Sequence, residues 1–239
     1  MQPFLIFDAY GTLAELDDFA GRSQRGFAQR GVELPLDVVA RAARCEMRHY
    51  VTHTVRARTQ EDWLALRHEC SVVLAESFCR QNFPLALPPE LIYDIMSDAL
   101  AFRAFPEVIT VLEALRQKGL AMAVLSNWDI FLPDVLQSLG LLHFFAFILT
   151  SAEIGVQKPA PRIFECALQR ARVLHPGLAA SGCYYIGDHY EGDVLGARAA
   201  GMTPFWLVRD ERDLVSGGTH AGGDDVARLS TLRDLLEII

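Results

Sequence analysis

The chain carries the residues FLIFDAYGTL at positions 4–13, and this stretch decides the fold. Four apolar residues in a row, Phe4–Phe7, are typical of a strand buried in a parallel sheet. The apolar run stops at Asp8, and Gly11 permits a tight turn beyond it, in which backbone N–H groups converge. Asp8 is therefore predicted to end a buried strand, where a nucleophile could stand.

The composition is that of a folded, acidic chain. Its 239 residues are 51% hydrophobic and 10% aromatic, which is enough to bury a substantial core. Thirty acidic against 22 basic side chains give a net charge of −8, so neither nucleic acid nor an anionic membrane surface is an expected partner. The five cysteines form no C-x-x-C pair, which favours a reducing cytoplasm over disulfides or a zinc site. No stretch approaches the roughly 20 apolar residues that span a bilayer, and no basic leader precedes the first strand.

Four later segments repeat the pattern of the first strand and alternate with helical patterns. The helix predicted over Pro106–Lys118 has apolar residues at helical spacing and is followed by Gly119 as a stop. This alternation predicts an α/β fold, with a parallel sheet of about five strands flanked by helices. The other predicted strands are Ala121–Leu125, Phe144–Leu149, Cys183–Ile186 and Pro204–Val208, and the other predicted helices are Pro161–Arg172, Gly192–Ala200 and Ser230–Ile238, the last capped by Ser230.

Residues 14–104 interrupt the alternation, because their pattern is helical. Thr59 and Asp62 form a predicted capping box ahead of the run Trp63–Gln81, and prolines at 35, 88 and 89 mark helix starts. We therefore predict an all-helical cap over residues 14–104, inserted into a core of residues 1–13 and 105–239. Such insertions at the carboxyl ends of parallel strands are where lids over active sites occur. The glycine-containing stretches 216–218 and 222–223 predict a loop near the C-terminus.

Polar side chains stand where the predicted strands end. Ser126 and Asn127 follow the second strand, Lys158 precedes a helix start, and Asp188 and Asp193 follow the fourth strand. Each of them alone is explained as a turn, cap or surface residue. Because strand ends in a parallel sheet meet at one edge, the ordered set predicts a pocket shared with the aspartate that ends the first strand.

The residue types in this pocket indicate hydrolysis of an anionic substrate. Three carboxylates need a compensating cation, and hard oxygen ligands suit Mg²⁺. Lys158 would offset the remaining negative charge and orient Asp8. Ser126 and the backbone N–H groups after Asp8 could donate to the oxygens of a small anionic substrate. Attack by Asp8 would then give a covalent intermediate that water resolves.

The same residues resemble the four motifs of the haloacid dehalogenase superfamily of hydrolases. The first motif is Asp8-x-Tyr10-Gly11-Thr12, Ser126 matches the second, Lys158 the third, and Gly187-Asp188 with Asp193 the fourth. The helical insertion lies where the type 1 cap of that family lies, so the resemblance covers essentially the whole chain. It implies a Rossmann-like core, an aspartyl covalent intermediate and, in most members, Mg²⁺.

The resemblance and the pocket chemistry together give each site residue a predicted role. The catalytic residues are Asp8 as nucleophile, Tyr10 and Lys158. The substrate-binding residues are Thr12, Ser126 and Asn127, and the metal ligands are Asp8, the backbone carbonyl of Tyr10, Asp188 and Asp193.

Tyr10 leaves the reaction open between phosphate and carbon chemistry. Phosphatases of the superfamily normally carry an aspartate there as acid and base, whereas a phenol with a pKa of about 10 donates a proton but is a poor base at neutral pH. The sequence Asp-Ala-Tyr-Gly-Thr is similar instead to the first motif of L-2-haloacid dehalogenases. Those enzymes typically lack the first carboxylate of the fourth motif, which this chain retains as Asp188. Proteins resembling the rhythmically expressed gene 2 group combine a retained fourth motif with a substituted first-motif acid.

Three functions follow from this conflict. We weigh the retained carboxylate pair more heavily than the changed acid, because a carboxylate cluster without a cation repels itself. A Mg²⁺-dependent hydrolase of a small phosphate ester is therefore favoured. The alternatives are a metal-independent 2-haloacid dehalogenase and a catalytically weak binding protein that keeps the fold. The oligomeric state stays open.

Further residues could contribute to the site, but each is explained more simply as a surface charge, a packing residue or a turn residue. Cap arginines could hold a leaving halide, two aromatic residues could wall the pocket, a histidine could act as base, and an acidic pair could replace the missing acid. These residues are Arg22, Arg25, Arg30, Trp128, Phe131, His189, Asp17 and Asp18.

Overall fold

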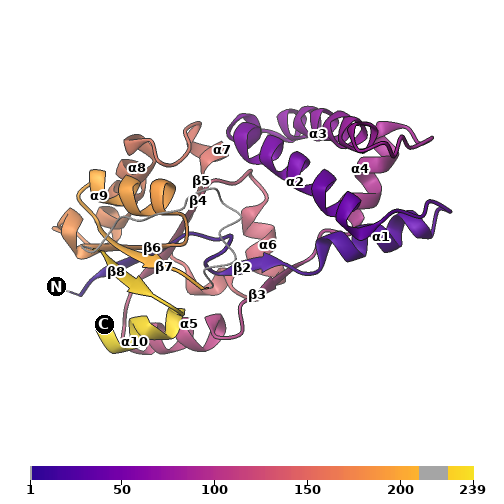
Figure 1. Cartoon of the computed structure of the whole chain (residues 1–239). Coiled ribbons are helices and arrows are strands. Elements are labelled where there is room, and N and C mark those ends of the chain that lie inside the picture. The colour runs from indigo at the N-terminus through magenta and orange to yellow at the C-terminus, as the bar shows by residue number, and fades with distance from the viewer. Residues whose placement is uncertain (1, 210–225) are drawn as a thin grey trace.

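A six-stranded parallel sheet forms the centre of the computed structural model, which describes residues 2–209 and 226–239 (Figure 1). The strand order is β5-β4-β1-β6-β7-β8, so the strand that carries FLIF lies between two neighbours. The strands are β1 (Phe4–Phe7), β4 (Met122–Ser126), β5 (Ile148–Thr150), β6 (Cys183–Gly187), β7 (Thr203–Leu207) and β8 (Ala227–Leu229). The predicted glycine-containing loop lies outside the described residues.

The five predicted strands are confirmed, and β8 at the sheet edge is an addition to them. The residues of β8 are Ala-Arg-Leu, and only Leu229 is buried, so a three-residue edge strand gives too weak an apolar pattern to be recognised. The strand predicted over Phe144–Leu149 begins later, because its first residue belongs to the 3-10 turn Leu142–Phe144.

Side chains of β1 alternate between the two faces of the sheet, and both faces are covered. Leu5 and Phe7 pack with α5 (Val108–Gln117), α6 (Leu132–Ser138) and α10 (Leu235–Ile238). Phe4 and Ile6 pack on the other face with α8 (Pro161–Leu174) and α9 (Gly196–Ala199). A strand buried on both faces reads as a continuous apolar run, which explains the FLIF pattern.

Two predicted helices are shorter and less regular than expected. The one predicted over Gly192–Ala200 starts as a π-helical turn, Tyr190–Leu195, before α9. The one predicted over Ser230–Ile238 starts as a 3-10 turn, Leu232–Asp234, and its cap is Thr231 rather than Ser230. The Asp234 carboxylate accepts hydrogen bonds from both backbone N–H groups of residues 230 and 231, which fixes this start one residue later.

Four helices form a separate layer beside the sheet, at the upper right of Figure 1. Their apolar residues, which include Phe27, Val39, Leu74 and Ile95, make a cluster of their own. The helices are α1 (Phe19–Ala28), α2 (Leu36–His53), α3 (Gln60–Arg80) and α4 (Pro89–Asp98), with the 3-10 turn Thr54–Arg56 after α2. The capping box that was predicted at Thr59 is present at the start of α3.

Residues 14–104 are not helical throughout, which corrects the all-helical description of this segment. It begins with β2 (Ala14–Leu16) and ends with β3 (Phe102–Ala104), which pair antiparallel. Each strand is three residues long, too short to give a period-two pattern. The pair brings the two ends of the segment together where it leaves and rejoins the sheet. The domain boundaries themselves stay a prediction.

Within the described ranges, no helix combines the length and the apolar character needed to cross a membrane.

Candidate active site

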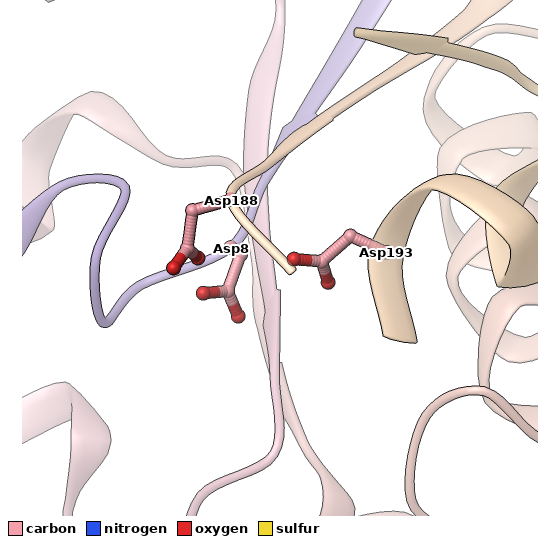
Figure 2. Close-up of side chains that lie close together, drawn as sticks. All are labelled: Asp8, Asp188 and Asp193. Carbon is pink, nitrogen blue, oxygen red and sulfur yellow. The ribbon is translucent and has the colours of Figure 1, made fainter. Parts of the chain in front are cut away.

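Three aspartates from the carboxyl ends of β1 and β6 meet at one edge of the sheet. Asp8 follows β1 directly, Asp188 follows β6, and Asp193 lies in the helical turn behind it. One carboxylate oxygen from each lies within 4.8 Å of the others. Figure 2 shows the carboxylate of Asp8 between those of Asp188 and Asp193. The parallel topology thus gathers residues that lie up to 185 positions apart in the sequence.

Lys158 is the cation of this cluster, and it is buried, with 6% of its surface exposed. Its Nζ donates to Oδ1 of Asp8 at 2.6 Å and to Oδ1 of Asp193 at 2.5 Å. It also donates to the hydroxyl of Tyr185 at 2.9 Å. All three ammonium protons are therefore used, which holds the lysine in one position.

Ser126 and Asn127, at the end of β4, contact the cluster in different ways. The Ser126 hydroxyl donates to Oδ1 of Asp8 at 2.8 Å. The Asn127 amide donates to the Lys158 carbonyl at 3.1 Å and accepts from the Lys158 N–H at 2.7 Å. Asn127 thus fixes the backbone that presents the lysine, and its predicted role in substrate binding stays a prediction.

Two glycines give the aspartates the room they occupy. Gly11 has a φ of +79°, and a Cβ placed on it would lie 2.3 Å from Oδ2 of Asp188. A Cβ on Gly187 would lie 2.3 Å from Oδ2 of Asp193. A side chain at either position would displace the carboxylate that it meets, so the observed close approach of both carboxylates depends on glycine.

Burial and mutual repulsion dominate the electrostatics of the cluster. Burial, with the charges of Asp8 and Asp193 next in importance, raises the pKa of Asp188 well above its ordinary value. Burial also raises the pKa of Asp8, although Lys158 opposes it. Burial alone would lower the pKa of Lys158, but Asp193 and Asp8 outweigh it and raise that pKa. Three carboxylates and one ammonium leave two negative charges without a partner, which suits a divalent cation with oxygen ligands.

Tyr10 and Thr12 lie on the turn that follows the nucleophile candidate. Tyr10 is 44% exposed, and its backbone forms an isolated bridge with Ala14. Thr12 is fully buried, and its hydroxyl donates to Oδ1 of Asp188 at 3.4 Å. The predicted roles of Tyr10 in acid catalysis and of its carbonyl in metal binding are not tested by these contacts.

Tyr185 belongs to the site although it was not predicted. It lies inside β6, and burial raises its pKa well above the ordinary value. Its hydroxyl lies 2.9 Å from the Leu125 carbonyl and 3.1 Å from Oδ1 of Asp193, and it accepts from Lys158. In the sequence it is one of several apolar or aromatic residues of a strand, so no sequence signal indicated that its hydroxyl contacts the charged groups of the site.

Arg209 and Glu107 also support the site, and they too were not predicted. The Arg209 guanidinium donates to the carbonyls of Gly11 and Thr12 at 3.1 and 2.7 Å. It pairs with the buried Glu107 carboxylate at 2.5 Å and lies over the Phe105 ring. Burial opposes ionisation of Glu107, but Arg209 outweighs it and lowers the pKa. Arg209, which follows β7, therefore stabilises the turn after Asp8, although the two segments lie about 200 residues apart in the sequence.

The residues that were considered less favoured candidates for the site contact other protein groups. Arg22 donates to the Ala99 carbonyl, Arg25 pairs with Asp18, Arg30 reaches the Gly26 carbonyl, and Asp17 lies near Arg22 and Arg103. His189 accepts from the Gly192 N–H at 2.8 Å. The Trp128 and Phe131 rings pack against Phe102 and Trp63 of the helical segment.

Comparison with known proteins agrees with this arrangement. A family model for haloacid dehalogenase-like hydrolases matches residues 4–201. Haloacid dehalogenase-like hydrolase domain-containing protein 3 of Mus musculus is 40% identical over 120 residues, 50% of this chain and 46% of that protein. The chain thus spans about half the length of the first curated relatives it matches.

Relatives with different reactions align over longer stretches. Glyceraldehyde 3-phosphate phosphatase of Methanothermobacter thermautotrophicus is 31% identical over 169 residues, 70% of this chain and 72% of that enzyme. (S)-2-haloacid dehalogenase 2 of a Pseudomonas species is 27% identical over 211 residues, 86% and 83% of the two chains. A crystallised L-2-haloacid dehalogenase shares the fold, with a TM-score of 0.71 at 24% identity over 99% of this chain and 98% of that one. By its four motifs, its sheet and the family match over most of its length, the chain belongs to the haloacid dehalogenase-like hydrolases.

Proposed function

We propose that the protein is a Mg²⁺-dependent phosphatase of small phosphate esters, with Asp8 as nucleophile. The observation that carries this proposal is the carboxylate cluster of Asp8, Asp188 and Asp193, with oxygens within 4.8 Å and one buried lysine. The cluster retains the donor set and the excess negative charge that fit a divalent cation. The similarity to a glyceraldehyde 3-phosphate phosphatase supports the same reaction.

The three aspartates and the Tyr10 carbonyl would hold the ion. When bound, Mg²⁺ supplies positive charge that offsets the charge of the phosphoryl oxygens. Lys158 and the Ser126 hydroxyl both donate to Oδ1 of Asp8. They orient the carboxylate so that its other oxygen, Oδ2, is the one presented to a substrate. In addition, Ser126, Thr12 and Asn127 are proposed to bind the anionic substrate.

The proposed hydrolysis takes place in two steps, formation of a phosphoaspartyl intermediate and its hydrolysis. A carboxylate oxygen of Asp8 attacks phosphorus, the ester P–O bond breaks, and the leaving oxygen takes a proton from the Tyr10 phenol. Water then gives a proton to the Tyr10 phenolate, its oxygen bonds to phosphorus, and inorganic phosphate leaves with both electrons of its bond to Asp8 returning to the carboxylate. Because a phenol has a pKa of about 10, both proton transfers are less effective than with a carboxylate in this position.

The proposal is tested by assaying the purified chain against a panel of phosphate esters and 2-chloropropionate, with Mg²⁺ and with a chelator. We expect phosphate release that depends on Mg²⁺ and falls by about 100-fold or more with chelator. Chloride release at the same rate with and without chelator would overturn the proposal.

Exchanging Tyr10 for aspartate should raise phosphatase turnover. A carboxylate can serve as acid and then as base near neutral pH, and general acid–base catalysis contributes roughly 100-fold or more. Tyr10 is 44% exposed, so the change creates no buried charge. Tyr10→Phe is the matched control, and it should lower turnover because the phenolic proton is lost. If a folded, Mg²⁺-binding Tyr10→Asp variant shows no gain in kcat, the tyrosine in place of an aspartate is not what limits phosphatase turnover.

A 2-haloacid dehalogenase is the second candidate, and Tyr10 is the observation that favours it. Displacement of halide from carbon needs no proton for the leaving group, so a tyrosine in place of the acid is no handicap. The similarity to a Pseudomonas 2-haloacid dehalogenase points the same way. The same panel of substrates separates the two reactions.

The site of action is proposed to be the cytoplasm. The five cysteines, all within the described residues, are free thiols, which fits a reducing compartment. The net charge of −8 argues against nucleic acid as a partner, so a small anionic molecule remains the proposed substrate.

A further inference from the structure

The loop between β4 and α6 connects the active site to the helical layer, residue by residue. Ser126 holds Asp8, and Asn127 holds the Lys158 backbone. The carbonyl of Trp128 accepts hydrogen bonds from Ser151 and Ala152, the first two residues of α7 (Ser151–Ile154), which follows β5. Asp129 is the next residue, and its partner comes from the helical layer.

The Asp129 carboxylate is buried between the two layers, with 4% of the residue exposed. Its Oδ1 accepts from the Phe131 N–H at 2.7 Å, within the loop. Its Oδ2 accepts from the hydroxyl of Tyr50 at 2.7 Å, and Tyr50 belongs to α2. One oxygen of this carboxylate therefore stabilises the loop, and the other binds helix α2 of the helical layer.

The environment of Asp129 makes this hydrogen bond hard to replace. Its donors are neutral groups, because the Trp63 side chain of α3 hydrogen-bonds to it besides the Phe131 N–H and the Tyr50 hydroxyl. A buried carboxylate that depends on neutral donors is costly once one donor is lost. Burial also raises the pKa of Asp129, although its hydrogen bonds oppose the rise.

Other contacts surround this hydrogen bond. The Trp63 ring of α3 packs edge-on against Phe131, with centroids 5.1 Å apart. A cleft of about 460 Å³ lies beside it, between the start of α3 and the segments that follow β4 and β5. The cleft is lined by Arg58, Thr59 and Asp62 on one side and by Ile130, Ala152 and Glu153 on the other. Asp129 precedes Ile130 of this lining, so its hydrogen bond to Tyr50 lies next to the cleft.

We propose that Tyr50 and Asp129 are positioning residues that dock the helical layer onto the loop that follows Ser126, and so keep the layer and this loop in the arrangement that binds substrate. As a statement about substrate binding, the inference rests on the proposed function. If the layer docks only part of the time, the apparent affinity falls in proportion to the docked fraction, whereas saturating substrate restores docking. Loss of the hydrogen bond should therefore raise KM and leave kcat nearly unchanged.

The test compares Tyr50→Phe and Asp129→Asn with Tyr93→Phe. Tyr93 is a matched control, because it packs against the same small apolar cluster as Tyr50 but its hydroxyl interacts with Ser97 of its own helix. An asparagine at 129 has a single acceptor oxygen and so cannot serve the Phe131 N–H together with the donors from the helical layer. Both test variants should raise KM for the best substrate of the panel by about tenfold, since a buried acceptor that loses its donor forfeits about that factor.

Hydrogen exchange supplies a readout that does not depend on activity. Backbone amides of residues 127–131 should exchange faster in Tyr50→Phe and Asp129→Asn than in the unaltered protein and in Tyr93→Phe. Unchanged exchange in both test variants overturns the inference, and so does an equal rise of KM in the Tyr93→Phe control. If the unaltered protein hydrolyses no substrate, the proposed function fails while the exchange experiment still decides whether Tyr50 docks the layer.

Discussion

Exchanging Asp8 for asparagine is expected to abolish hydrolysis, with a fall in kcat of roughly 10⁴-fold or more. An amide is not a nucleophile of this kind, so neither a phosphoryl nor an alkyl intermediate can form. The geometry should survive, because the amide oxygen can still accept from Ser126 and Lys158, which donate to Oδ1 at 2.8 and 2.6 Å. Phosphate and halide release under single-turnover conditions measures the loss.

The control for this variant is Asp37→Asn, which changes an exposed aspartate paired with Arg41 on α2 and should leave turnover unaffected. A thermal melt of Asp8→Asn should show a folded protein, because the change removes one of three crowded negative charges. Full activity in Asp8→Asn would mean that another group is the nucleophile. The prediction holds for phosphatase and dehalogenase chemistry alike, so it tests the site apart from the choice of reaction.

The fold could be predicted from the sequence where one local pattern decided it. FLIF, buried on both faces of the sheet, gives an unbroken apolar run, and the rule that strand ends share an edge then places Asp8, Asp188 and Asp193 together. The strand β8 has one buried residue in three and gives no such pattern. Short edge elements are held by pairing with a neighbour, and pairing is a property of the folded chain.

The parts of the site that could not be predicted depend on distant contacts. Tyr185 sits within an apolar strand, and only the structure shows its hydroxyl beside Lys158 and Asp193. Arg209 clamps a turn almost 200 residues earlier in the chain. Asn127 could be placed at the edge of the sheet, but the motif does not reveal that its amide is occupied by the Lys158 backbone. Residue type and spacing specify where a side chain stands, and they do not specify which partner it finds.

Exchanging Lys158 for methionine should lower both activity and stability. Methionine fills a similar volume without charge, so Asp8 and Asp193 lose the cation that lies 2.6 and 2.5 Å from their oxygens. Removing one partner of a buried ion pair costs about 3–5 kcal/mol of unfolding free energy. Turnover should fall by about 100-fold or more, because Asp8 loses a donor that orients it. Denaturant unfolding and steady-state kinetics measure the two effects.

The chain offers a matched control, since Lys118 is its one other lysine. Lys118 donates to the Leu236 carbonyl in an exposed position, so Lys118→Met should leave turnover unchanged and shift stability little. Wild-type turnover in Lys158→Met would remove the lysine from the mechanism.

A double variant separates the structural role of Lys158 from its role in the reaction. Adding Asp193→Asn to Lys158→Met removes one of the two carboxylates that the lysine neutralises, so part of the lost unfolding free energy should return. Turnover should not return, because Asp8 still lacks its donor and the carboxylate cluster has lost a member. If activity recovers together with stability, the lysine acts only by keeping the site folded. If stability recovers alone, loss of folding does not account for the loss of turnover.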